Sequence, residues 1–238
     1  TGTGSFTSSI TGLSASTAYF VRAYATNSAG TAYGNELTFT TAVQQVAPTV
    51  TTTAISSITS SSAVSGGNVT SDGNASVTAR GVAYGTAANP TTANTTVSGG
   101  TGTGAFTSNI TGLSASTTYN VRAYATNSVG TSYGSNLSFT TSAPPATLAS
   151  VSTTAASSVT CSTATSGGNV TSDGGASVTA RGVAYGTVAN PTTANSTVSA
   201  GTGTGTFTSN LTGLSASTTY NVRAYATNSV GTEYGSQE

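Results

Sequence analysis

Side chains capable of acid–base or nucleophilic chemistry are few in this sequence and stand far apart. The 238 residues include no His, five acidic residues and five basic residues, all of them Arg. A hydrolytic nucleophile needs a neighbouring base, and carboxylate-pair catalysis needs two acids within reach of one bond. Asp72 and Asp173 each stand alone beside a Gly, and Glu36 and Glu233 are isolated. No catalytic residue is assigned, and the sequence predicts that the chain is not an enzyme.

Metal and cofactor sites lack their ligands for the same reason. Zinc sites use sets of Cys and His, and calcium sites use several clustered carboxylates. The chain has one cysteine, Cys161, and the stretch Asp72-Gly-Asn74 is more typical of a turn than of a calcium loop. No metal site and no cofactor are therefore predicted. Cys161 occupies the slot that Ser60 has one repeat earlier; we expect a neutral replacement, with an intermolecular disulfide as the alternative.

Charge and hydropathy exclude two classes of partner. The formal net charge is zero, and five scattered Arg cannot form the basic surface that neutralises nucleic-acid phosphates. The sequence has neither a basic amphipathic helix nor an apolar run of about 20 residues. We therefore expect no nucleic-acid partner and no membrane insertion.

Internal repetition sets the domain organisation. The segment TGTGAFTSNITGLSASTTYNVRAYATNSVG begins at Thr101 and returns, almost unchanged, at Thr202 and at Thr1. The period of about 100 residues is that of a domain and not of a solenoid repeat. We expect residues 1–42 to be the C-terminal half of one repeat, residues 43–142 a complete repeat, and residues 143–238 a repeat without its last strand. The repeat is cut at both ends, so a longer tandem array is expected.

Alternation with period two predicts strands throughout, with no helical period. Between Thr118 and Thr126, Val121 and Ala123 fall on one face, and Arg122 and Tyr124 on the other. Seven strands are expected in one repeat: 49–55, 63–70, 76–85, 94–98, 104–111, 117–126 and 132–141. Turns are expected at Ser71-Asp-Gly-Asn74 and at Asn127-Ser-Val-Gly130. The predicted fold class is all-β, with tandem seven-stranded antiparallel sandwiches.

The run from Gly112 to Gly130, GLSASTTYNVRAYATNSVG, resembles the last third of a fibronectin type III domain. Leu113 followed by Tyr119 matches the tyrosine corner of that immunoglobulin-like family. The resemblance implies the same structural role for Tyr19, Tyr119 and Tyr220. The whole repeat is similar to the Thr/Ser-rich fibronectin-like repeats of large surface and secreted proteins of Bacteroidetes. One departure is the absence of Trp, which that family usually carries on its second strand.

Two interactions of arginine are predicted from the strand pattern. Arg122, Tyr124 and the neighbouring Tyr133 are expected to form an outward Arg–Tyr surface, either a glycan-binding patch or a set of stabilising cross-strand pairs. Arg80 and Arg181 are expected to pair with Asp72 and Asp173, respectively, at one end of each sandwich.

The leading functional hypothesis is an extracellular, non-catalytic stalk or filament module of a surface adhesin-type protein. Its expected partners are further copies of the repeat in the same chain, with like chains in a fibre as a second option. Two alternatives stay open: a repeated domain that binds surface glycans with avidity, and a spacer attached to a secreted enzyme.

Overall fold

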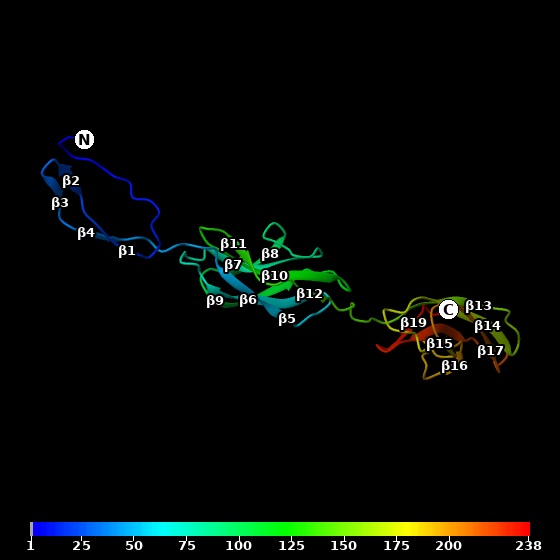
Figure 1. The fold of residues 1–238 in the computed structure, drawn as a ribbon. Coiled ribbons are helices and arrows are strands. Elements are labelled where there is room, and N and C mark those ends of the chain that lie inside the picture. The colour runs from blue at the N-terminus through cyan, green and yellow to red at the C-terminus, as the bar shows by residue number, and fades with distance from the viewer. Residues whose placement is uncertain (1) are drawn as a thin grey trace. The chain divides into compact units, whose positions relative to one another are not determined.

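The fold consists of strands and loops only. A computed structural model describes residues 2–238, and over that range it contains no helix (Figure 1). A helix of the length and apolar character needed to cross a membrane is accordingly not present in the described part of the chain. The chain divides into two compact units, one ending at Ala143 and the other beginning at Pro144.

The first unit begins with the partial copy of the repeat, which forms two small antiparallel sheets. Strand β1 (Ala18–Val21) pairs with β4 (Leu37–Thr40), and β2 (Tyr24–Asn27) pairs with β3 (Gly30–Tyr33). Apolar side chains of this copy are exposed: Ile10 is 51% exposed, whereas its counterpart Ile110 is 0% exposed. Burial of these positions therefore depends on the earlier strands of the same repeat, which cover them in the complete copy.

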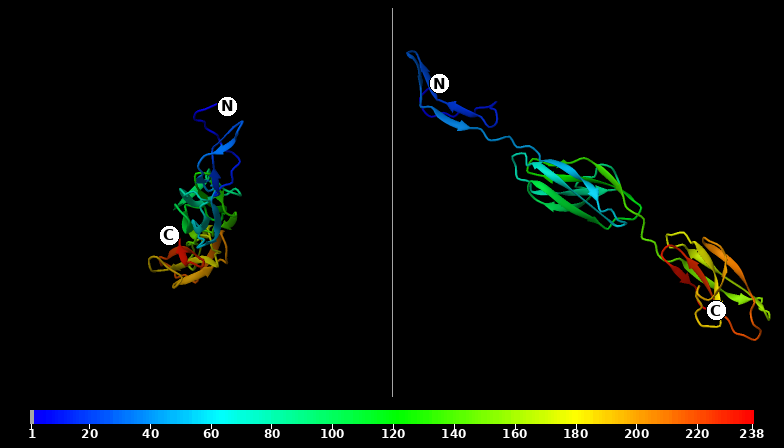
Figure 2. Two further views of the ribbon diagram at one scale, coloured as in Figure 1. Left: turned by 60° about the vertical axis from the view of Figure 1, so that its left-hand side comes forward. Right: turned by 90° about the horizontal axis from the view of Figure 1, so that it is seen from below.

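The complete middle repeat consists of two antiparallel sheets (Figure 2). One sheet has the order β5-β6-β9, and the other has the order β11-β10-β7-β8, with β12 also paired to β10. Their bounds are β5 Thr49–Ser56, β6 Ser62–Ser71, β7 Ala79–Gly85, β8 Thr95–Gly100, β9 Gly104–Thr111, β10 Thr118–Thr126, β11 Thr131–Tyr133 and β12 Leu137–Thr140. Strands β8 and β9 are consecutive in the chain but lie in different sheets, so the loop between them crosses from one layer to the other.

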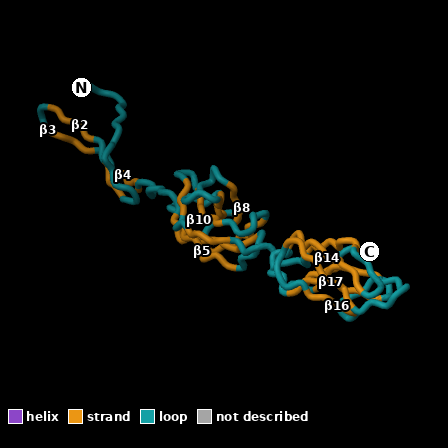
Figure 3. Tube along the Cα trace, turned by 90° about the vertical axis from the view of Figure 1, so that its right-hand side faces the viewer, coloured by secondary structure: helices purple, strands orange, loops and turns teal. Residues whose placement is uncertain are grey.

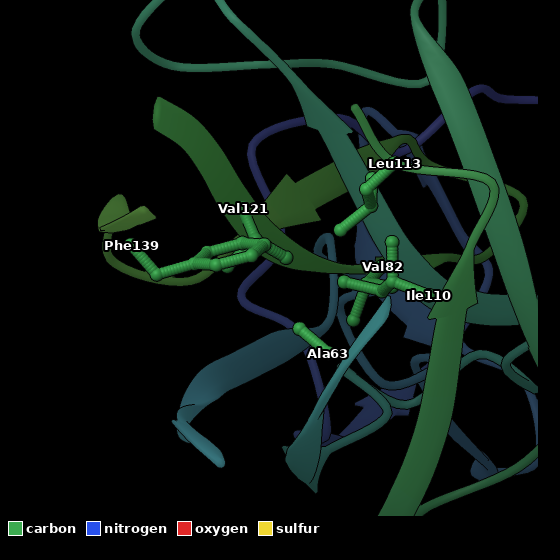
Figure 4. Close-up of a cluster of buried hydrophobic side chains, with 6 residues drawn as sticks. All are labelled: Ala63, Val82, Ile110, Leu113, Val121 and Phe139. Atoms are coloured by element: carbon green, nitrogen blue, oxygen red, sulfur yellow. The ribbon is translucent and has the colours of Figure 1, made fainter. Parts of the chain in front are cut away.

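The core lies between these two layers and is assembled from both. The main cluster of buried side chains comprises Ala63, Val82, Ile110, Leu113, Val121 and Phe139 (Figure 4). Ala63 and Ile110 come from the β5-β6-β9 sheet, and Val82, Val121 and Phe139 come from the other sheet. A second cluster, of Val50, Val69, Val77, Ala123 and Ala125, lies beside it. Phe106 packs against both clusters and joins them. The alternation predicted for β10 is confirmed on its inward face, where Val121, Ala123 and Ala125 are fully buried; Tyr124 on the opposite face is also buried.

The last predicted strand, 132–141, is divided into β11 and β12. Tyr133 pairs with Tyr124 and Leu137 with Val121, so three residues on this side face only two on β10. The extra residue falls in the stretch Gly134-Ser-Asn136. A Cβ at Gly134 would lie 2.5 Å from the Thr52 nitrogen of β5. The chain therefore bends where it passes close to the other sheet, which a one-strand pattern cannot reveal.

The second unit repeats this arrangement. Its sheets have the orders β13-β14-β17 and β16-β15-β18-β19, with strands drawn in orange in Figure 3. The bounds are β13 Ser150–Ser157, β14 Thr163–Ser172, β15 Ala180–Gly186, β16 Ser196–Ser199, β17 Gly205–Thr212, β18 Asn221–Thr227 and β19 Thr232–Tyr234. The backbone of Glu238 bonds with Val222 at the place where Leu137 pairs with Val121. The core is again split into two clusters bridged by one phenylalanine, Phe207.

One buried polar atom in each core has no partner. Ser108 of β9 is 2% exposed, and its Oγ accepts and donates no hydrogen bond; Ser209 is in the same state. Ser65, the cross-strand neighbour of Ser108, does donate a hydrogen bond, to the Thr53 carbonyl at 3.1 Å. An unpaired buried hydroxyl costs about 1–3 kcal/mol of desolvation.

The double variant Ser108→Ala/Ser209→Ala is therefore expected to be more stable than the natural chain, by about 1 kcal/mol per repeat. Urea unfolding followed by tyrosine fluorescence measures this. The matched variant Ser65→Ala/Ser166→Ala removes a satisfied hydroxyl and is expected to lower stability. A loss of stability in the Ser108 variant would contradict the assignment of an unpaired hydroxyl.

Candidate functional site

The predicted turn at residues 71–74 is present, but the predicted ion pair beside it is wrong. Gly73 and Asn74 have φ of +68° and +64°, and the backbone N–H of Asn74 donates to Asp72 Oδ1 at 2.9 Å. Arg80 lies elsewhere: its Nε donates to the Gly99 carbonyl at 3.0 Å, and its guanidinium lies over the Phe106 ring. Arg181 makes the equivalent contacts in the second unit. The arginine carbon stem follows the inward face of its strand, which directs the guanidinium to backbone carbonyls and not to the turn.

The predicted Arg–Tyr surface is present as a stacked pair on β10 and β11. The Arg122 guanidinium carbon lies 4.8 Å from the centre of the Tyr133 ring, and its Nε donates to the Gly134 carbonyl at 2.9 Å. The Tyr133 hydroxyl accepts from the Thr92 amide at 3.0 Å. The stack recurs as Arg22 with Tyr33 and as Arg223 with Tyr234. The two side chains stack on each other, and each also makes a hydrogen bond to the backbone. These contacts favour a stabilising role for the pair.

Tyr124 contributes little accessible surface to this patch. It pairs across the sheet with Tyr133 and with Gly81, and it is only 8% exposed. A Cβ at Gly81 would lie 3.0 Å from the Tyr124 ring. The absence of a side chain at Gly81 thus leaves space for the Tyr124 ring against the neighbouring strand. Burial raises the pKa of the equivalent Tyr225, and the nearby Tyr234 phenol raises it further.

The hydrogen bond expected of a tyrosine corner is found in all three copies. The amides of Ser14, Ser114 and Ser215 donate to the hydroxyls of Tyr19, Tyr119 and Tyr220, at 2.8, 3.1 and 3.1 Å. In the middle repeat the Tyr119 ring also stacks on Phe139, with 5.9 Å between ring centres. Hydrogen bonds from Ser215 lower the pKa of Tyr220 because they stabilise the phenolate, and the bond from the Ser215 backbone amide has the largest effect.

A buried asparagine that was predicted only as a turn residue organises one end of the repeat. Asn127 is 5% exposed, and its Nδ2 donates to the carbonyls of Val46 and Asp72 at 2.7 and 2.8 Å. Its Oδ1 accepts from the amides of Val129 and Gly130 at 2.9 and 3.2 Å. Asn228 repeats all four bonds in the second unit. The side chain therefore ties the hairpin to the segment that enters the repeat.

A groove in the second unit is lined by residues whose counterparts form the core of the middle repeat. The groove has a volume of about 350 Å³, lies beside Tyr220 and is lined by Ala164, Leu211, Leu214 and Val222. Their counterparts in the middle repeat, Ala63, Ile110, Leu113 and Val121, enclose Phe139. In the middle repeat the strand β12, which carries Phe139, packs against the corresponding residues.

Clusters of three or more residues able to hold a metal ion are absent over residues 2–238. Cys161 is exposed and free.

No known family model and no curated protein matches this chain. Across both units the fold repeats contacts that stabilise the sandwich, namely the tyrosine hydroxyls, the Arg–Tyr stacks and the buried asparagines.

Proposed function

We propose that the chain is a non-catalytic, extracellular structural module, in which tandem fibronectin type III-like repeats form an elongated stalk or filament of a bacterial surface adhesin-type protein. The observation that carries the proposal is the repetition of internal contacts. The four hydrogen bonds of Asn127 recur at Asn228, and the Arg122–Tyr133 stack recurs at Arg223 and Tyr234. The recurring contacts thus stabilise each sandwich internally. Such a repeated, self-contained domain suits a protein in which the number of domains sets the length of a stalk.

Strand order supports the proposed family. Three strands pair as β5-β6-β9, and the other five pair around β10 and β7. If β11 and β12 are counted as one interrupted strand, this division of seven strands into two sheets supports a fibronectin type III-like sandwich. The Tyr119 hydroxyl bond lies at the entry to β10, the position of the tyrosine corner in such folds. The light core, built from valine and alanine in place of tryptophan, is a departure that leaves the two-sheet arrangement intact.

Composition supports the proposed location. Only 4% of the residues are charged, and the chain has one cysteine. Thr and Val favour the pleated surface of a sheet, and each of the two sandwiches buries its apolar side chains between paired strands. Such a surface suits prolonged exposure outside the cell.

Single-molecule force spectroscopy of the 238-residue chain tests the mechanical part of the proposal. We expect two separate unfolding events, each releasing on the order of 300 Å of chain, because the middle repeat and the second unit each hold their own core. Immunogold electron microscopy of intact source cells, with an antibody against the chain, tests the location, and we expect label outside the cell along thin threads. Label confined to the cell interior would refute the extracellular stalk.

A second candidate function rests on the repeated Arg–Tyr stack. Aromatic and guanidinium surfaces bind sugars through apolar ring contacts and hydrogen bonds, and repetition adds avidity. A glycan array with the natural chain and with Arg122→Ala/Arg223→Ala measures this. Binding that falls at least about tenfold in the variant would establish an adhesive surface; an array without bound glycans would leave the stack a purely stabilising pair.

A further inference from the structure

The loop that crosses between the two sheets has an unusual backbone. Gly100, Gly102 and Gly104 all have positive φ, of +90°, +77° and +95°. Positive φ is readily adopted only by glycine. This geometry turns the carbonyls of Gly102, Thr103 and Gly104 toward one point, where they surround Arg80 Nη1 at 3.4, 2.7 and 3.1 Å. Together with the bond from Nε to Gly99, four backbone carbonyls receive hydrogen bonds from one guanidinium.

Chemically, this arrangement is a cation site. Converging carbonyl dipoles present partial negative charge, and a planar guanidinium matches them because it offers several N–H donors in fixed directions. The Phe106 ring covers one side of the group, with 5.2 Å between the guanidinium carbon and the ring centre. Phe106 also packs against both core clusters. The arginine therefore connects the crossover loop to the core.

The same site is built twice. In the second unit, Arg181 Nη1 donates to the carbonyls of Gly203, Thr204 and Gly205 at 3.3, 2.7 and 3.2 Å. Gly203 and Gly205 have φ of +80° and +97°, close to the values in the middle repeat.

The partial first copy shows the same loop sequence without an arginine in it. Its glycines Gly2 and Gly4 have φ of +124° and +121°. Arg22 is the counterpart of Arg122, and like Arg122 it donates to a glycine carbonyl, that of Gly34, and lies over a tyrosine ring, that of Tyr33.

We propose that the β8–β9 loop is a backbone-carbonyl site specific for a guanidinium group, and that each repeat fills it with its own arginine to hold the crossover between its two sheets closed. Loss of the arginine opens the loop and uncovers the Phe106 ring. The site holds its cation without a carboxylate partner. It is independent of where the protein is located and of what it binds.

The test is hydrogen–deuterium exchange, followed by mass spectrometry, of the full chain carrying Arg80→Ala. Peptides from the two loops differ at Ala105 and Thr206, so the intact Arg181 loop serves as a reference within the same molecule. We expect amides between Thr101 and Phe106 to exchange at least about tenfold faster, while the Arg181 loop is unchanged. Guanidinium chloride, well below denaturing concentration, is expected to slow this exchange again, and sodium chloride of equal ionic strength is not.

Arg122→Ala is the matched control, because Arg122 also covers an aromatic ring but donates to a single carbonyl. Loop exchange that rises no more in Arg80→Ala than in this control would overturn the proposal. So would an equal effect of the two salts, since it would mean that no guanidinium site exists.

If Arg80→Ala unfolds the whole repeat, Arg80→Lys decides the matter. Lysine keeps the stem and the charge but lacks the planar set of donors. We expect faster exchange confined to the loop. Unchanged loop exchange, or unfolding of the whole repeat in this variant as well, would contradict a guanidinium-specific loop site.

Discussion

Replacing Gly67 by Ala is expected to destabilise the middle repeat by about 3 kcal/mol. Gly67 lies on β6, facing the other sheet, where an added Cβ would stand 2.6 Å from the Ala123 Cβ and 2.9 Å from Phe106 Cζ. A third close neighbour is the Thr51 carbonyl oxygen at 2.7 Å. Because these contacts involve both sheets and the backbone of β5, no single side chain can move aside to relieve them.

Gly85→Ala is the matched control for this prediction. Gly85 ends β7, an added Cβ there would have no atom within 4 Å, and its φ is not positive. Its replacement is expected to leave stability unchanged or slightly raised. Urea unfolding, with hydrogen exchange to identify which repeat unfolds first, measures both variants. Equal stability of the two variants would show that the sheets are not held at the close spacing described here.

Replacing Asn127 by Ala is expected to cost about 3 kcal/mol or more. The side chain uses both of its donors and accepts two hydrogen bonds, all within the 5% exposed environment at the end of the repeat. Its removal leaves the carbonyls of Val46 and Asp72 and the amides of Val129 and Gly130 without their partner. Unpaired buried groups of this kind cost more than the net value of the lost bonds.

Two further variants make the prediction for Asn127 specific. Asn127→Asp keeps the shape of the side chain but directs a carboxylate at two carbonyl oxygens, so we expect a similar loss of stability at neutral pH. In acid the carboxyl group is protonated and can donate one hydrogen bond, so we expect stability to recover in part. Asn109→Ala, at an exposed position on β9, is expected to be neutral. The free energy of unfolding of each variant checks this, and a neutral Asn127→Ala would contradict a role in joining the hairpin to the entering segment.

Local pattern was sufficient for most of the strands. Alternation predicted the inward face of β10, where Val121, Ala123 and Ala125 are all fully buried. Gly and Asn predicted the turns at residues 72–74 and 127–130, which the structure contains. These features follow from the two-residue period of a strand and from backbone preferences, both of which act between residues close in sequence.

The environment of the arginines and tyrosines was less accessible to sequence reasoning. Arg80 was expected beside Asp72, but it bonds to carbonyls between Gly99 and Gly104. Tyr124 was placed correctly on the face opposite Val121, yet it is buried because Gly81 leaves space for its ring. The start of β7 at Ala79 and the break between β11 and β12 were also missed.

The sequence by itself determined the repeat, the all-β class, the alternation of faces and the scarcity of side chains suited to catalysis, since each follows from composition or from spacing along one strand. Only the tertiary structure decided which polar groups meet. Asn127 reaches Val46 across 81 positions of sequence, and Arg80 reaches Thr103 across 23. The physical reason is that a buried donor binds whichever acceptor the packed layers place beside it, and that placement depends on the register and spacing of two sheets together.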